Sequence, residues 1–126
     1  MKAHYAVKCN PNPGVLRVLA EMGACFDCAS KAEIQQALSH CTSPDRIVYA
    51  NPCKAVPELL FAKQEDVKQM TFDNEEELHK IKRHFPDAHV ILRIYADDHD
   101  SDIPLGTVVC NPGALPMPML CATPEH

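Results

Sequence analysis

Residues 25–34, Cys-Phe-Asp-Cys-Ala-Ser-Lys-Ala-Glu-Ile, lead from a predicted strand into a predicted helix. The first residues are apolar and bulky, as in a buried strand. Ser30 is followed three residues later by Glu33, which is the spacing of a capping box at the start of a helix. The segment is therefore a strand joined directly to a helix, the basic unit of an α/β fold.

The same strand-to-helix pattern recurs about every 20 residues along the chain. The predicted strands are rich in β-branched or aromatic residues and cover residues 4–9, 25–29, 46–50, 68–72 and 89–95. The residues between them carry apolar side chains at helical spacing. This alternation predicts a parallel sheet with right-handed crossovers, in either a barrel or an open doubly wound sheet. Periodicity alone does not choose between these two folds.

The composition is that of an ordinary globular domain. The chain has 126 residues, of which 46% are hydrophobic and 23% charged, and this length supports one core. The net charge is -5 and the basic residues are scattered among acidic ones, so we expect no nucleic-acid partner. No apolar run approaches the roughly 20 residues of a membrane-spanning helix, and no signal-peptide pattern precedes the first strand. We expect a cytoplasmic protein with no membrane partner.

Cysteine usage favours reduced thiols. The chain has seven cysteines, an odd number that argues against a disulfide framework. Cys25 and Cys28 have the CxxC spacing of redox and zinc sites, but a second CxxC or a His pair at ligand spacing is missing. We interpret them as two small buried thiols on a strand and its exit, and expect no metal site.

Three charged residues interrupt the apolar strands: Lys8, Asp27 and Arg93. All three would lie near the carboxyl ends of parallel strands, where α/β folds place their functional groups. An enclosed Lys8 would be costly to keep charged and could form imines, although a solvated or paired lysine is the commoner outcome. Asp27 in apolar surroundings needs a cation or a donor, and the always protonated fork of Arg93 suits a phenolate or a phosphate.

Longer motifs carry a family resemblance. They are Tyr-Ala-Val-Lys-Cys-Asn at residues 5–10, Phe-Asp-Cys-Ala-Ser-Lys-Ala-Glu-Ile at 26–34, Tyr-Ala-Asn-Pro-Cys-Lys at 49–54, Met-Thr-Phe-Asp at 70–73 and Leu-Arg-Ile at 92–94. In this order they resemble the eukaryotic ornithine decarboxylase family. The resemblance implies a fold type III pyridoxal phosphate enzyme. The chain would then form a partial TIM (β/α)8 barrel of the alanine-racemase-like type, with about five strands and four helices.

The resemblance also assigns roles to four residues. Lys8 matches the lysine that holds pyridoxal 5'-phosphate as a Schiff base, and Asp27 matches an acidic residue beside the cofactor. Glu33 matches an acidic neighbour of that site, and Arg93 matches the arginine that contacts the phenolic oxygen of the cofactor. The implied activity is decarboxylation of L-ornithine to putrescine, in a homodimer. The family's phosphate loop, pyridine-binding Glu and catalytic Cys-Asp pair have no matching positions, so we expect this chain alone to be inactive.

The character of the sequence changes after Gly106. Residues 107–126 contain four prolines and no apolar period. We therefore expect residues 1–106 to form a partial pyridoxal-phosphate-binding barrel domain and residues 107–126 to be a divergent, irregular tail. The predicted strands at residues 4–9 and 89–95 would then be unpaired edges, which predicts a marginally stable chain that associates with other copies.

Three other interpretations remain open. The chain could be a noncatalytic, antizyme-inhibitor-like regulator that binds antizyme. Asp27 argues against this, because such relatives tend to lose active-site acids, and the corresponding surface, placed around Lys54 to His79, is rich in Glu and Asp. It could instead belong to a related diaminopimelate or arginine decarboxylase. It could also be a truncated product without a function of its own.

Overall fold

The computed structural model describes residues 2–40, 42–95 and 107–110. Within them one six-stranded sheet is formed, in the spatial order β1-β2-β3-β4-β5-β6. The strands are β1 (His4–Ala6), β2 (Cys25–Cys28), β3 (Ile47–Tyr49), β4 (Gln69–Phe72), β5 (His89–Tyr95) and β6 (Thr107–Cys110). The helices are α1 (Pro13–Glu21), α2 (Lys31–Ser39), α3 (Val56–Gln64) and α4 (Glu75–His84), which follow the first four strands in turn.

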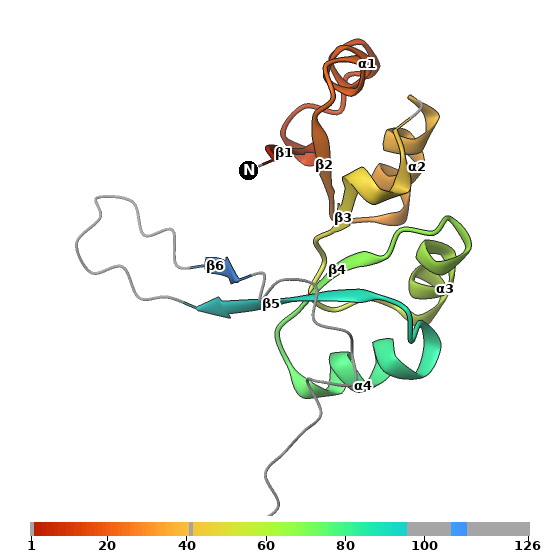
Figure 1. Ribbon diagram of the computed structural model, residues 1–126, viewed down its shortest axis with the longest axis vertical. Coiled ribbons are helices and arrows are strands. Elements are labelled where there is room, and N and C mark those ends of the chain that lie inside the picture. The colour runs from red at the N-terminus through yellow and green to blue at the C-terminus, as the bar shows by residue number, and fades with distance from the viewer. Residues whose placement is uncertain (1, 41, 96–106, 111–126) are drawn as a thin grey trace, which may run out of the picture.

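The order of the strands decides between a barrel and a doubly wound sheet. β1 to β5 are all parallel, and each pairs with the next strand in the sequence. Right-handed crossovers between such neighbours place every helix on the same face of the sheet. A doubly wound sheet instead reverses its strand order and carries helices on both faces. Figure 1 shows the four helices together on one side of the strands. The α/β, partial TIM-barrel fold is confirmed.

The core lies between the sheet and the helices. Successive side chains of a strand point to opposite faces, and one set of alternate residues, including Phe26, Tyr49 and Met70, is fully buried against the helices. The helices contribute further buried residues, among them Leu16, Ile34, Leu59 and Ile81. The other alternate residues, such as Asp27 and Thr71, are thereby left to the inner face of the sheet, which is the face that positions the candidate site.

Three helices begin at a polar side chain just after a strand or turn. The side chains of Asn12, Ser30 and Asn74 accept hydrogen bonds from backbone N–H groups of the first helical turn, the shortest at 2.9, 3.3 and 2.8 Å. These bonds satisfy donors that have no partner within the helix. Gly23, just after α1, has a φ of 84°, which favours glycine and ends that helix. The predicted capping box at Ser30 is thus confirmed as a helix start.

β6 differs from the irregular structure that we expected from residue 107 onward. It pairs antiparallel with β5, with Arg93 opposite Val109. Two adjacent valines favour strand structure, and β5 would otherwise present an open edge of unpaired backbone groups. The expectation was therefore wrong for residues 107–110, as was that of an unpaired β5. Residues 111–126 lie outside the described residues, and the domain boundary after Gly106 stays a prediction.

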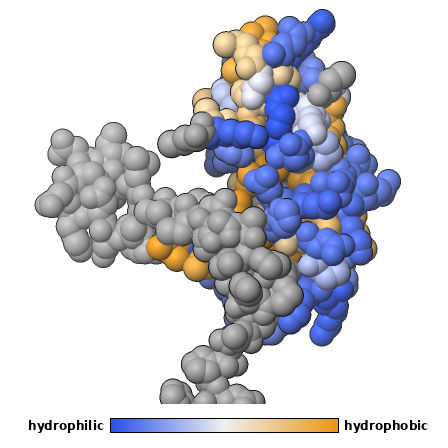
Figure 2. Space-filling model, viewed as in Figure 1, coloured by the Kyte–Doolittle hydropathy of each residue, from blue (hydrophilic) through white to orange (hydrophobic). Residues whose placement is uncertain are grey.

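The surface of α3 and α4 is mainly hydrophilic on the face shown in Figure 2. The first turn of α4 carries three glutamates and its last turn carries two basic residues and a histidine, an order that suits the helix dipole. Within the described ranges, no helix is long and apolar enough to cross a membrane.

The two cysteines of the CxxC motif are buried free thiols on β2, as predicted. Cys25 is 2% exposed and Cys28 is fully buried. Burial, with smaller contributions from the nearby carboxylates of Glu33 and Asp27, raises the pKa of Cys28 to about 12. The Cys28 thiol is consequently protonated at neutral pH and packs as a small apolar side chain.

Candidate functional site

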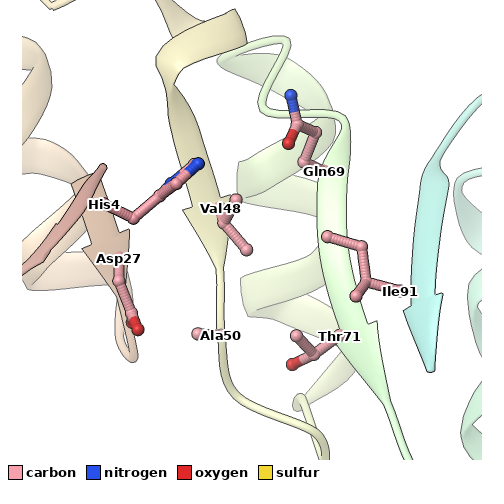
Figure 3. Close-up of a pocket in the computed structure, with 7 residues that line it drawn as sticks. All are labelled: His4, Asp27, Val48, Ala50, Gln69, Thr71 and Ile91. Atoms are coloured by element: carbon pink, nitrogen blue, oxygen red, sulfur yellow. The ribbon is translucent and has the colours of Figure 1, made fainter. Parts of the chain in front are cut away.

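A hollow opens on the inner face of the sheet. It measures about 300 Å³ and is lined by residues on or next to the parallel strands: His4, Asp27, Val48, Ala50, Gln69, Thr71 and Ile91. Figure 3 shows these residues on successive strands, with the carboxylate of Asp27 directed toward the carboxyl ends. In a closed barrel such a face is filled by side chains, and functional groups gather at the carboxyl ends of the strands. We call those ends, residues 7–10, 27–33, 50–55, 71–74 and 93, the carboxyl edge.

Lys8 lies in a 3-10 turn, Val7–Cys9, that directly follows β1. The predicted strand at residues 4–9 was wrong for Lys8, whose side chain is exposed, in line with the solvated lysine that we considered the commoner outcome. The reason is local: Val7 is fully buried in the core, and the tight turn then directs the next side chain outward. The side chain of Asn10 accepts a hydrogen bond from the backbone of Asn12 at 3.1 Å and continues the turn toward α1. The Lys8 amine is therefore accessible to a small molecule.

Asp27 lies on β2, opposite Ala6 of β1, and is half-buried. Burial raises the pKa of its carboxyl group. The positive charges of Lys8 and His4 act in the opposite direction, and the negative charge of Glu33 adds to the rise. Asp27 is thus a partly desolvated carboxylate at the end of β2 that feels the positive charge of the accessible Lys8 amine.

Glu33 lies in the first turn of α2 and faces back toward the end of β2. Its backbone N–H donates to the side chain of Ser30 at 3.3 Å, and its carboxylate accepts from the backbone N–H of Ala29 at 2.6 Å. The second bond departs from a standard capping box, in which the carboxylate binds the N–H of the capping residue itself. Glu33 therefore both starts the helix and adds a second negative charge beside Asp27.

Arg93 lies on β5, separated from β2 by β3 and β4. Its guanidinium Nη2 lies 3.3 Å from Oδ2 of Asp73, which directly follows β4. The side chains of Arg93 and Asp73 are 40% and 32% exposed, so the pair remains open to solvent and to a bound molecule. The structure thus groups Lys8, Asp27 and Glu33 at one end of the carboxyl edge and places Arg93 with Asp73 at the other.

Sequence reasoning missed a buried ion pair at the same edge. The Lys54 ammonium lies 2.8 Å from the carboxylate of Glu77, and both side chains are essentially inaccessible, at 0% and 1% exposure. Lys54 is also the first residue of the stretch that corresponds to the family's antizyme-binding surface, but its buried side chain takes no part in that surface. Lysine and glutamate are seldom buried unless paired, and their partnership across 23 residues leaves no local pattern in the sequence. The one available signal was the position of Lys54 just after a strand.

Comparison with known proteins identifies the family. Residues 1–109 match the family model described as pyridoxal-dependent decarboxylase, pyridoxal binding domain. The chain belongs to this family. It is similar to ornithine decarboxylase of Saccharomyces cerevisiae, with 53% identity over 107 residues, which are 85% of this chain and 23% of the yeast protein. The family acts on small-molecule substrates through pyridoxal phosphate.

Two other relatives show the breadth of the similarity. Antizyme inhibitor 2 of Xenopus laevis is 50% identical over 101 residues, 80% of this chain and 21% of that protein. The solved structure of arginine decarboxylase from Paramecium bursaria Chlorella virus superposes with a TM-score of 0.78 at 40% identity and covers 84% of this chain and 29% of that one. The chain therefore spans less than a third of the length of these relatives.

Proposed function

We propose that this chain supplies the pyridoxal-binding part of an ornithine decarboxylase, which converts L-ornithine to putrescine and carbon dioxide in polyamine biosynthesis. The observation that carries the proposal is the accessible Lys8 amine at the end of β1, beside the half-buried carboxylate of Asp27. The 53% identity to yeast ornithine decarboxylase favours ornithine over other basic amino acids.

The side chains at the carboxyl edge fit pyridoxal phosphate chemically. The cofactor has an aldehyde, for which the amine of Lys8 is the matching group. It also has a phenolic oxygen and a phosphate, which are anionic, and the guanidinium of Arg93 suits either. The hollow of about 300 Å³ on the same face is at the lower end of the size usual for small-molecule sites. Lys8, Asp27, Glu33 and Arg93 are therefore the residues that would hold it.

Each of these residues would have a distinct task in decarboxylation. The bound cofactor supplies an electron sink that accepts the electron pair left when carbon dioxide departs. Lys8 would fix the cofactor at the end of β1. Asp27 and Glu33 would hold negative charge beside the Lys8 nitrogen. Arg93, steadied by Asp73, would orient an anionic oxygen.

The partners of the protein are also proposals. We infer that the protein forms a homodimer. We also infer a cytoplasmic location, which the free cysteines support. Antizyme is a second candidate partner, because antizyme inhibitor 2 is 50% identical over 101 residues. An antizyme-inhibitor-like regulator is the alternative function. It would not use Lys8 to bind a cofactor, so the experiment on Lys8 separates the two.

The test is covalent trapping of the cofactor. Turnover is not used as the measurement, because the chain spans 23% of the yeast enzyme. The purified 126-residue chain is mixed with pyridoxal phosphate, reduced with borohydride and digested for mass spectrometry. Label is expected mainly at Lys8 and is lost from the Lys8→Ala chain. Lys2→Ala is the matched control, since Lys2 is also exposed near β1. Equal labelling of surface lysines in all three chains would overturn the proposal.

A further inference from the structure

The Lys54 ammonium joins the ends of two neighbouring strands. Nζ donates to the backbone carbonyl of Asn51, in the loop after β3, at 3.0 Å. It also donates to the carbonyl of Thr71, in β4, at 2.7 Å, and lies 2.8 Å from Oε1 of Glu77 in α4. The ring of Tyr49 lies 5.8 Å away. One fully buried cation thus has three oxygen partners in three different segments: the loop after β3, β4 and α4.

Glu77 is held as firmly as Lys54. Its Oε1 also accepts from the backbone N–H of Lys54 at 3.2 Å, and its Oε2 lies 2.5 Å from the ammonium of Lys80. Its own N–H donates to the capping side chain of Asn74 at 2.8 Å. The start of α4 is therefore fixed to the loop after β3, and the segment between β4 and α4 has little freedom.

That short segment contains Asp73, which binds Arg93. Thr71 pairs with Ile91 and Phe72 with Leu92, so the parallel register brings the next pair, Asp73 and Arg93, to the same level. The tie from Lys54 to the Thr71 carbonyl lies two residues before Asp73, and the cap at Asn74 lies one residue after it. Asp73 therefore lies between a contact made by the Lys54 ammonium and a cap that joins Asn74 to the backbone of Glu77.

We propose that Lys54 and Glu77 are positioning residues that set the orientation of Arg93 through Asp73. Both side chains are buried, so they act through Asp73 and not by contact with a ligand. The inference rests on the proposed function in one respect: the anion that Arg93 would orient is the bound cofactor. The structural chain from Lys54 to Arg93 does not depend on that identity.

The test measures the accessibility of Arg93 directly. Phenylglyoxal modifies free guanidinium groups, so its rate at Arg93, followed by peptide mass spectrometry, reports whether Asp73 still holds the side chain. The variant is Lys54→Met with Glu77→Gln, which removes both charges but retains an oxygen that can accept from the backbone of residue 54. Its stability is measured by urea unfolding, and rates are compared only under conditions in which each chain is folded.

We expect the rate of phenylglyoxal modification at Arg93 to rise by up to about fivefold in the double variant, because a partly exposed ion pair contributes at most about 1 kcal/mol. The rate should approach that of Asp73→Asn, in which the ion pair is removed directly. Tyr49→Phe is the matched control. It removes a partly buried hydrogen bond from the same region, the 2.8 Å bond from the Tyr49 hydroxyl to Glu58, and leaves the hydrogen bond from Lys54 to Thr71 in place. Its rate at Arg93 should equal that of the unmodified sequence.

A double variant with an unchanged rate at Arg93 would overturn the positioning role, as would a Tyr49→Phe chain whose rate rose equally. Either result would make the pair a purely structural feature. The cofactor trapping at Lys8 is read separately, so failure of the proposed function leaves this outcome interpretable. If trapping succeeds, the double variant is also expected to require more pyridoxal phosphate for half-maximal labelling of Lys8.

Discussion

Arg93 and Asp73 face each other at the ends of two adjacent parallel strands, with Nη2 and Oδ2 3.3 Å apart. Both side chains are partly exposed, so we expect their ion pair to contribute at most about 1 kcal/mol to stability. Arg93→Lys should therefore leave the urea midpoint nearly unchanged. It should weaken the binding of pyridoxal phosphate, because lysine lacks the planar fork. Arg17→Ala is the control, since Arg17 forms an ion pair with Glu21 on the far more exposed surface of α1. Equal cofactor affinity in Arg93→Lys would remove Arg93 from the site.

The half-buried carboxyl group of Asp27 is expected to lower the stability of the fold while it supports binding of the cofactor. Burial raises the pKa of its carboxyl group in the folded chain. The folded state then holds its proton more tightly than the unfolded state, so stability falls as pH rises through the acidic range. Asp27→Asn should consequently be as stable as the parent chain at neutral pH, or more so, and its stability should change less between pH 4 and about 7. Lys8 labelling should decrease. A clear loss of stability would show that the charged form of Asp27 is needed for folding.

The sequence was most informative where the cause was local. The strand at His89–Tyr95 was predicted with the same bounds, and Ser30 was correctly predicted to begin a helix, because alternation and capping depend on adjacent residues. Lys8 was predicted to lie on the first strand but lies in the turn that follows it. The strand ends early because Val7 packs into the core against the helices, which the local sequence does not reveal. The Lys54 and Glu77 pair was not foreseen, since its two members meet only after β4 and α4 have formed.

Replacing Asn74 shows how much the hydrogen bond at the N-terminus of α4 contributes to stability. Its side chain accepts from the backbone N–H of Glu77 at 2.8 Å. Asn74→Ala should lower the free energy of unfolding by about 1 kcal/mol, whereas Asn74→Asp, which keeps an acceptor at the same place, should retain most of it. Urea unfolding at neutral pH measures both. Equal loss in the two variants would mean that Asn74 acts through something other than its cap.

Replacing Lys54 shows how much the buried ion pair with Glu77 contributes to stability. Lys54→Met removes one of the two ammonium groups that contact the buried carboxylate of Glu77, and this should cost up to about 3–5 kcal/mol. Adding Glu77→Gln removes the buried charge that has lost this partner and should recover a large part of the loss. The chemical denaturation midpoints of the two variants give the comparison. A double variant that is less stable than Lys54→Met would show that the carboxylate is stabilised mainly by its other contacts.

The pKa of Glu77 determines how the stability of the fold depends on pH in the acidic range. Burial alone would raise the pKa of its carboxyl group, but hydrogen bonds from Lys54 and Lys80 and the charge of Lys54 outweigh burial and hold the pKa below its usual range. A lowered pKa in the folded state means that the stabilisation is complete above the ordinary glutamate pKa of about 4.3 and is lost as pH falls through the lower, folded value.

The free energy of unfolding should therefore decrease steeply below pH about 4, and part of that slope belongs to Glu77. Glu77→Gln should be less stable than the parent chain at neutral pH, because Lys54 is left without its carboxylate, and its acid slope should be shallower. Urea unfolding at several pH values gives both curves. Glu75→Gln is the matched control, since it makes the same chemical change at an 85% exposed side chain of the same helix. Parallel curves for Glu77→Gln and the parent chain would show that Glu77 is not the group whose protonation weakens the fold.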